Sequence, residues 1–210
     1  RQCPPDYQYY RIPSPWLQVK CLRFLQYYEN PKDNENRNAL KDIITKIFVR
    51  SDNTESVNKA NAEHCIIYEG ISLITSYGVQ DADDELRKEV QSLLGKFVGS
   101  KDANIRYLAL EGLSRVARLE GSESVHEHIP TVMESLKDSD TSVRKRALDL
   151  LFVMADHSNC KEIIDELLVN LTLAESDMKE EFVVKIAIIG EVCVYSYMSG
   201  MWYMLYTITC

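Results

Sequence analysis

Two stretches of 14 residues carry nearly the same pattern: NIRYLALEGLSRVA at residues 104–117 and SVRKRALDLLFVMA at residues 142–155. They start 38 residues apart, and five aligned positions are identical. In both, apolar residues recur at spacings of three and four, which places them on one face of an α-helix. The stretches therefore predict two equivalent amphipathic helices. The identical positions are Arg106/Arg144, Ala109/Ala147, Leu110/Leu148, Leu113/Leu151 and Ala117/Ala155.

Weaker copies extend this repeat in both directions. Equivalent positions fall at Val19, Glu63, Ile105, Val143 and Met178, at intervals of 44, 42, 38 and 35 residues. A mean period of about 40 residues is typical of HEAT and armadillo helical repeats, whose helix pairs must stack to bury their apolar faces. The sequence thus predicts an all-α fold, an α-solenoid of about ten helices in antiparallel pairs. The predicted pairs lie at 15–50, 58–99, 124–156 and 161–192, with 102–118 joined to the helix before it.

The repeat also predicts contacts in the turns and in the core. An aspartate in the turn 138–140 can accept hydrogen bonds from the free N–H groups that open the next helix. Arg106 and Arg144, which share one repeat position, can each reach an aspartate of an adjacent turn and so form a ladder. The side chains expected in the core are those of Leu110, Leu113, Leu148, Leu151 and Ile186.

The chain divides into three parts by composition. Residues 1–14 hold three of the six prolines and should be extended; residues 15–191 carry the repeats; residues 192–210 form a tail without any charge. Pro15 suits the first turn of a helix, with Ser14 as its cap, and we expect the aromatic cluster around Trp16 to pack rather than bind a ligand. The tail nearly reaches the length of a membrane span, but its serines, threonines and glycine argue against one.

Composition excludes several classes of function. The net charge of −8 argues against binding nucleic acid through bulk charge. The six cysteines lack metal-ligand spacing, so we expect small, unpaired side chains in a reducing, cytosolic compartment. His126 and His128 alternate on a helix and should form a solvated helix start rather than a metal pair. The acidic run 81–85 fits a helix N-terminus. We predict no catalytic, metal or cofactor-binding residue, no cofactor and no enzymatic activity.

Several strings resemble the adaptins, the large chains of clathrin adaptor complexes. The most distinctive is YYRIPSPWLQVK at residues 9–20, which resembles the alpha type of the plasma-membrane complex. NIRYLALE at 104–111, residues 143–151 and residues 180–188 resemble strings that adaptins share more widely. The resemblance runs from about residue 6 to residue 191, and it implies a middle fragment of the α-solenoid trunk.

The resemblance also implies a function and partners. It implies a non-catalytic scaffold that contacts small, medium and beta-type large adaptor subunits, and through them clathrin and membrane cargo, in clathrin-dependent endocytosis. Its place would be cytoplasmic, peripheral at the cytosolic face of the plasma membrane, in coated pits. The resemblance assigns no partner-binding residue. The alternative is another HEAT-repeat binding scaffold, of the nuclear transport or phosphatase scaffold type.

Overall fold

The computed structural model describes residues 3–49, 56–78 and 83–209, and the side chains of 177, 192 and 195–209 lie outside what it describes. The chain forms two compact units, residues 1–93 (unit 1) and 94–210 (unit 2), and the division falls within helix α5, Asp84–Val98. The described residues are almost entirely helical, so the all-α prediction is confirmed; their one sheet is a two-stranded ladder.

Unit 1 is built around helix α3, Val57–Ser76, which packs against both α1 and α2. Before α1, strands β1 and β2 pair antiparallel through Tyr9 and Ile12. The predicted boundary between the pairs 15–50 and 58–99 is therefore crossed by packing, because α3 contacts both helices assigned to the earlier pair. The other elements of the unit are the 3-10 helix η1 (Pro5–Tyr7), β1 (Gln8–Tyr9), β2 (Ile12–Pro13), α1 (Pro15–Leu25) and α2 (Asn34–Phe48).

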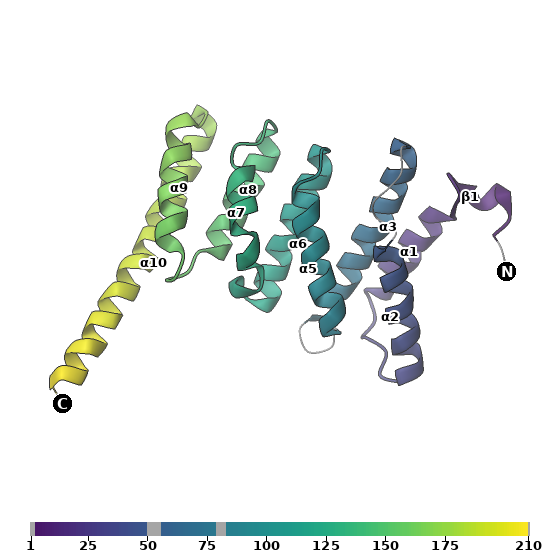
Figure 1. Ribbon diagram of the computed structural model, residues 1–210, viewed down its shortest axis with the longest axis horizontal. Helices are drawn as coiled ribbons and strands as arrows, with labels where there is room; N and C mark the ends of the chain where they lie inside the picture. Colours follow the sequence, from purple (N-terminus) through teal and green to yellow (C-terminus); the bar gives the residue numbers. More distant parts are fainter. Residues whose placement is uncertain (1–2, 50–55, 79–82, 210) are drawn as a thin grey trace. The chain divides into compact units, whose positions relative to one another are not determined.

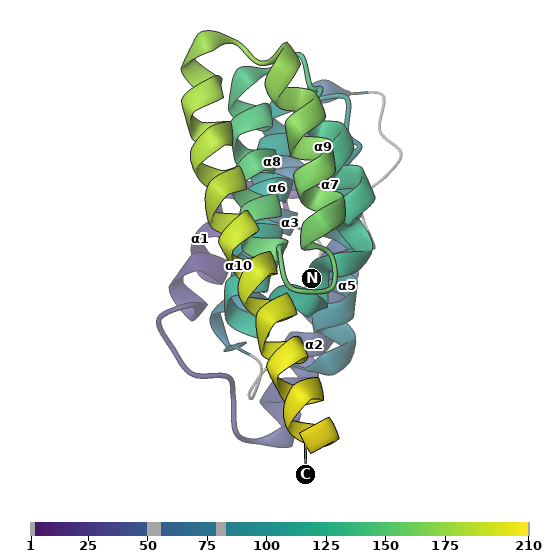
Figure 2. The same cartoon turned by 90° about the vertical axis from the view of Figure 1, so that its left-hand side faces the viewer.

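Unit 2 consists of helices in two layers. Helices α6, α8 and α10 form one layer, and α7 and α9 lie beside them in the other (Figure 1 and Figure 2). The predicted pairs 124–156 and 161–192 contain the packed helices α7 with α8 and α9 with α10. The bounds are α6 (Ala103–Glu120), η2 (Ser122–His128), α7 (Ile129–Ser135), α8 (Thr141–Met154), α9 (Cys160–Leu173) and α10 (Ser176–Thr209).

The repeat predicted from the sequence matches the helices. Its five equivalent positions fall on α1, α3, α6, α8 and α10; those on α6, α8 and α10 are each the third residue of the helix, and those on α1 and α3 lie further along. The predicted core is confirmed at the four leucines of α6 and α8, each of which is 0% exposed. It is wrong at Ile186, which is only half-buried. The buried stripe of α10 follows a slightly different phase of the helix and leaves Ile186 at its edge. That stripe consists of Met178, Phe182, Ile189 and Cys193.

Aspartates open the helices of the repeat as predicted. Asp140, the N-cap of α8, accepts from the backbone N–H groups of Ser142 at 2.8 Å and Val143 at 3.2 Å. Asp102 caps α6 in the same way, accepting from Asn104 N at 2.8 Å. These carboxylates satisfy donors that have no partner within the helix and favour the positive end of its dipole. The Arg-bearing helices α6 and α8 therefore begin at the predicted places.

The start of α1 departs from the prediction in two ways. Ser14 precedes Pro15 as expected, but its side chain does not cap the helix; its hydroxyl donates instead to the Tyr7 carbonyl oxygen at 3.2 Å. The prediction that the aromatic cluster packs is wrong for Trp16, which is 56% exposed. Among the described residues, the one aromatic ring paired with that of Trp16 is the ring of Tyr9, with 5.8 Å between the two centroids.

The tail continues α10 as a helix. The backbone of residues 192–209 extends the helix without a break (Figure 1). How the apolar side chains from Met198 to Leu205 pack lies outside the described residues. Within the part that the structure describes, no helix has both the length and the apolar character that crossing a membrane requires.

Candidate interaction surface

The predicted arginine ladder runs along the turns of unit 2. Arg106, on α6, donates from Nε and Nη2 to the two carboxylate oxygens of Asp138, at 2.5 and 2.8 Å. Its Nη1 donates to the carbonyl oxygens of Ser100 and Lys101 at 2.9 and 3.0 Å. One guanidinium thus closes its own turn and binds the next turn. Its two hydrogen bonds to the Asp138 carboxylate have the bidentate geometry that arginine favours.

Arg144 repeats this arrangement one unit further along the chain. Its Nη1 donates to the carbonyl oxygens of Asp138 and Ser139 at 2.9 and 3.2 Å, and its Nη2 donates to Glu175 at 3.0 Å. The predicted ladder is confirmed, although its second acidic partner is a glutamate rather than an aspartate. The two steps differ in burial, since the Asp138 side chain is 9% exposed and that of Glu175 is 66% exposed.

Burial and charge shift the ionisation of the first pair. The hydrogen bond from Arg106 holds the pKa of Asp138 below its ordinary value despite partial burial of the carboxylate. The same bond raises the pKa of the Arg106 guanidinium. Both groups are therefore charged at neutral pH, and the pair is a structural link between two turns rather than an acid–base couple.

A second strip of paired charges crosses the outer side of α6, α8 and α10. Arg146 of α8 donates to the Tyr107 hydroxyl at 2.6 Å and forms an ion pair with Glu111 at 2.8 Å, both on α6. Lys185 of α10 forms an ion pair with Asp149 of α8 at 2.5 Å. The hydrogen bond to Tyr107 is the largest influence raising the pKa of Arg146. The strip joins all three helices of this layer.

The surface around this strip is only partly neutralised. Leu108, Arg115 and Arg118 are exposed on α6 and lie three, four and seven positions from Glu111, hence on the same side of the helix. On α10, Val184 and Ile188 are exposed beside Lys185. We call this surface the α6–α8–α10 face. It consists of Tyr107, Leu108, Glu111, Arg115, Arg118, Arg146, Asp149, Phe152, Val184, Lys185 and Ile188.

The other predicted features have structural positions. The pair His126 and His128 lies in the 3-10 helix η2, not at a solvated helix start: the His128 ring packs so closely on Gly95 that a Cβ there would lie 2.4 Å from it. At the acidic run, Asp83 accepts from the N–H groups of Glu85 and Leu86 at 3.0 and 3.3 Å, which fits the predicted helix start. No group of three metal-ligating side chains occurs among the described residues.

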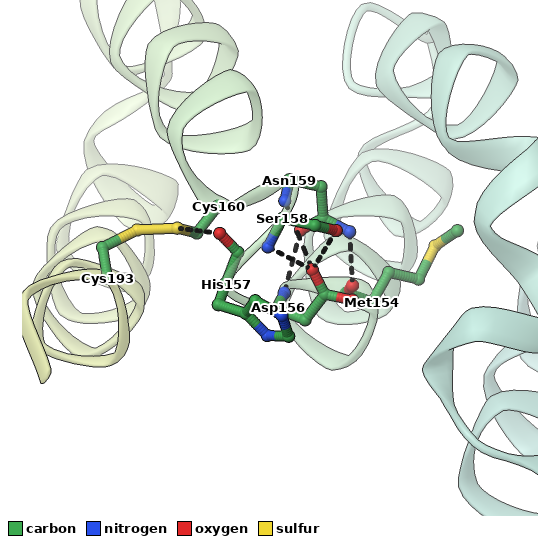
Figure 3. The surroundings of a disulfide bond; sticks show 7 residues. All are labelled: Met154, Asp156, His157, Ser158, Asn159, Cys160 and Cys193. Atoms are coloured by element: carbon green, nitrogen blue, oxygen red, sulfur yellow. Dashed lines mark hydrogen bonds between the residues drawn. A yellow bond between two sulfur atoms is a disulfide. The ribbon is translucent and has the colours of Figure 1, made fainter. Parts of the chain in front are cut away.

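The prediction of unpaired cysteines is wrong for two of them. Cys160, the first residue of α9, is joined to Cys193 of α10 by a disulfide, with 6.2 Å between the Cα atoms (Figure 3). The pairing escaped sequence reasoning because the residues lie 33 positions apart and meet only through the packing of α9 against α10. Cys21 and Cys65 are free and exposed, and Cys3 is free.

Comparison with known proteins agrees with the helical repeat. The family model described as the adaptin N terminal region matches residues 7–207. The chain belongs to the adaptin family. This adaptin chain is similar to AP-2 complex subunit alpha-1 of Arabidopsis thaliana. The two are 43% identical over 189 residues, which cover 90% of this chain and 18% of the relative.

Two further relatives refine the position of this adaptin. AP-2 complex subunit alpha-2 of Dictyostelium discoideum is 42% identical over 195 residues, covering 91% of this chain and 19% of its own length. AP-1 complex subunit gamma of the same organism is 35% identical over 187 residues, covering 89% and 20%. This chain therefore spans about a fifth of the length of these relatives, and it is more similar to these two alpha subunits than to this gamma subunit.

Proposed function

We propose that this adaptin chain is a non-catalytic scaffold segment of a clathrin adaptor large subunit of the alpha type. It acts in intracellular protein transport and clathrin-dependent endocytosis through protein–protein contacts. The observation that carries the proposal is the 43% identity with an AP-2 alpha subunit over nine-tenths of the chain. The gamma subunit of another adaptor complex is less similar, at 35%.

The chemistry of the described residues supports a scaffold. The polar groups of the α6–α8–α10 face are largely paired with one another, through Arg146 to Glu111 and through Lys185 to Asp149. Such pairs fix neighbouring helices but leave few groups positioned to act on a substrate. Stacked helix pairs present extended surfaces, which repeat proteins use to bind other proteins.

The expected partners are the small, medium and beta-type large adaptor subunits, with clathrin and cargo as indirect ones. The place of action is the cytosolic face of the plasma membrane. We infer that the α6–α8–α10 face is the contact surface in unit 2, because it offers exposed Leu108 and the exposed cations Arg115 and Arg118 beside a rigid strip of ion pairs. An apolar residue flanked by charges is the usual composition of a non-obligate interface.

The alternative is another HEAT-repeat scaffold, of the nuclear transport or phosphatase type. The repeat architecture alone fits it equally well. Similarity to named AP-2 subunits favours the adaptor proposal.

Co-expression with the three adaptor chains tests the proposal. The chain should co-purify with at least one of the small, medium and beta-type subunits. Arg115→Glu with Arg118→Glu should weaken this by about tenfold or more, since reversed charges at an interface cost several kcal/mol. Lys161→Glu is the matched control, because Lys161 is exposed on α9 in the other layer, and it should leave co-purification unchanged. A folded chain that captures none of the three subunits would refute the proposal.

A further inference from the structure

We propose that the Cys160–Cys193 bond is a reversible thiol–disulfide clamp that fastens the open end of the α9–α10 hairpin. Helices α9 and α10 are joined by a short turn between Leu173 and Ser176 and run back along each other (Figure 1). Cys160 begins α9, at the end of the hairpin farthest from that turn. The bond therefore lies where two packed helices would first separate.

The clamp holds the last described contact of α10. Its buried stripe runs from Met178 through Phe182 and Ile189 to Cys193. Among residues whose side chains are described, Cys193 is the final buried one, and α10 continues as a helix for 16 residues, from 194 to Thr209. Among the described side chains, breaking the bond would leave Ile189 as the last buried one that holds α10 against its neighbours without a covalent link.

Reduced Cys160 would have a hydrogen-bond acceptor in place. It is the first residue of the 14-residue helix α9, and its sulfur lies 3.9 Å from the His157 carbonyl oxygen (Figure 3). The thiol can therefore donate to this carbonyl oxygen once the disulfide is broken.

The preceding loop keeps Cys160 in place. The Asp156 carboxylate accepts from Ser158 N at 2.7 Å and Asn159 N at 3.2 Å, and the Asn159 side chain donates to the Met154 carbonyl oxygen at 3.0 Å (Figure 3). These bonds do not involve either sulfur. The loop can keep its shape when the disulfide is broken, so the sulfurs remain close enough to bond again.

The chemistry is exchange with a dithiol. One thiolate of the dithiol attacks the sulfur of Cys193, because this residue is the more exposed of the two, at 9% against 2% for Cys160. The S–S bond breaks, the Cys160 thiolate leaves, and a mixed disulfide forms at Cys193. The second thiolate of the dithiol then displaces the Cys193 thiolate, and the dithiol becomes a disulfide. A small-molecule disulfide reverses both steps and restores the bond.

A regulatory role rests on the proposed function. In the cytosol, disulfides are kept mostly reduced, and those that form are usually transient and redox-sensing. At the proposed location the clamp would be open at rest and closed under oxidising conditions. The described end of the α9–α10 hairpin would then be fastened covalently only when the compartment becomes oxidising.

Differential alkylation of the full chain tests the bond. After equilibration with oxidised glutathione, Cys160 and Cys193 should stay unmodified by iodoacetamide and joined to each other, whereas the exposed Cys21 and Cys65 should carry either glutathione or the alkyl group. After dithiothreitol, all four should react, and oxidised glutathione should restore protection. Alkylation of Cys160 and Cys193 by iodoacetamide in the oxidised sample would overturn the proposal.

Hydrogen exchange tests the mechanical role. On reduction, amides of residues 186–194 should exchange about tenfold faster or more, as expected for local opening of a hairpin, while α8 should be unchanged. Cys193→Ser should exchange fast under both conditions, and Cys65→Ser should behave as wild type. Equal exchange in oxidised and reduced protein would overturn the clamp. These readouts need no adaptor partner, so failure of the co-purification test is distinguishable from failure here.

Discussion

Replacing Arg106 by alanine should destabilise the protein far more than the same change at Arg144, although the two arginines occupy one repeat position. Both close their own turn through two carbonyl oxygens. They differ in the acidic partner, because Arg106 binds a nearly buried Asp138 through two hydrogen bonds while Arg144 binds an exposed Glu175 through one. The comparison therefore tests the combined effect of burial and two-bond geometry on a charge pair, with Arg144 also donating to the Thr141 hydroxyl at 2.9 Å.

The structure sets the size of the difference. Removing one partner of a buried pair costs about 3–5 kcal/mol, because the remaining charge loses its compensation. Asp138 keeps one backbone donor, Asp140 N at 2.8 Å, so we expect a loss of about 3 kcal/mol for Arg106→Ala, at the low end of that range. An exposed pair contributes about 0–1 kcal/mol, so Arg144→Ala should cost about 1 kcal/mol with its carbonyl bonds included.

Urea unfolding followed by circular dichroism at pH 7 measures both values. With a slope of about 3 kcal/mol/M for a chain of this size, the midpoint should fall by about 1 M for Arg106→Ala and about 0.3 M for Arg144→Ala. Arg115→Ala, exposed on α6, should change it little and serves as the control. Equal losses at Arg106 and Arg144 would refute the argument that burial of the carboxylate decides the energy.

The same pair predicts a pH dependence. The pKa of Asp138 is lowered in the folded protein by Arg106, so its stabilisation is fully present above the unfolded value of about 3.9. It is lost as the pH falls through the folded pKa, when the carboxylate becomes protonated. The difference in unfolding free energy between wild type and Arg106→Ala should therefore be constant from pH 5 to 7 and shrink below about pH 4.

Two further pairs of substitutions test the packing. Gly112→Ala should destabilise by about 1 kcal/mol or more, because its Cβ would lie 2.5 Å from Cδ2 of the fully buried Leu94. Gly190→Ala has open space and should stabilise α10 by up to about 1 kcal/mol; thermal melting of both variants shows whether the signs are opposite. Leu151→Ala should cost about 2–5 kcal/mol, and Ile186→Ala clearly less because the side chain is half-buried; equal urea midpoints would contradict this ranking.

Sequence periodicity predicted most of the fold because it reports what a helix buries. Residues that recur after 38 positions, such as Leu110 and Leu148, lie in the core. The aspartates that precede the helices act as N-caps. Local patterns were sufficient there because capping and amphipathic burial depend on residues within one or two turns. Ile186 was assigned wrongly because its phase depends on how α10 packs against α9, which a repeat alignment does not contain.

Contacts between distant residues could not be predicted in the same way. The Cys160–Cys193 bond requires the register of two antiparallel helices. A signal was present, since Cys193 follows Ile189 by one helical turn and Cys160 precedes Ile163 by three residues, so both lie on buried stripes. The burial of His128 likewise depends on Gly95, 33 positions earlier, where the missing side chain admits the ring.

A Glu-Gly pair recurs at one position of the repeat, and its contacts explain why few acidic groups on these helices are left for chemistry. Glu69-Gly70 and Glu111-Gly112 occupy equivalent positions on α3 and α6. In each, the glycine allows close approach of a side chain from the preceding helix, Phe48 at 3.2 Å and Leu94 at 2.5 Å from a built Cβ.

The glutamate of each Glu-Gly pair links its helix to another helix of the repeat. Glu69 accepts from Arg23 of α1 at 2.7 Å, and Glu111 pairs with Arg146 of α8. Because Glu111 forms an ion pair with Arg146, and Asp149 with Lys185, the acidic residues of the α6–α8–α10 face are already paired when a partner protein binds. Recognition must then depend on the exposed residues of the face, which on α6 are Leu108, Arg115 and Arg118. Reversing the charges of the two arginines therefore tests the proposed function without disturbing the fold.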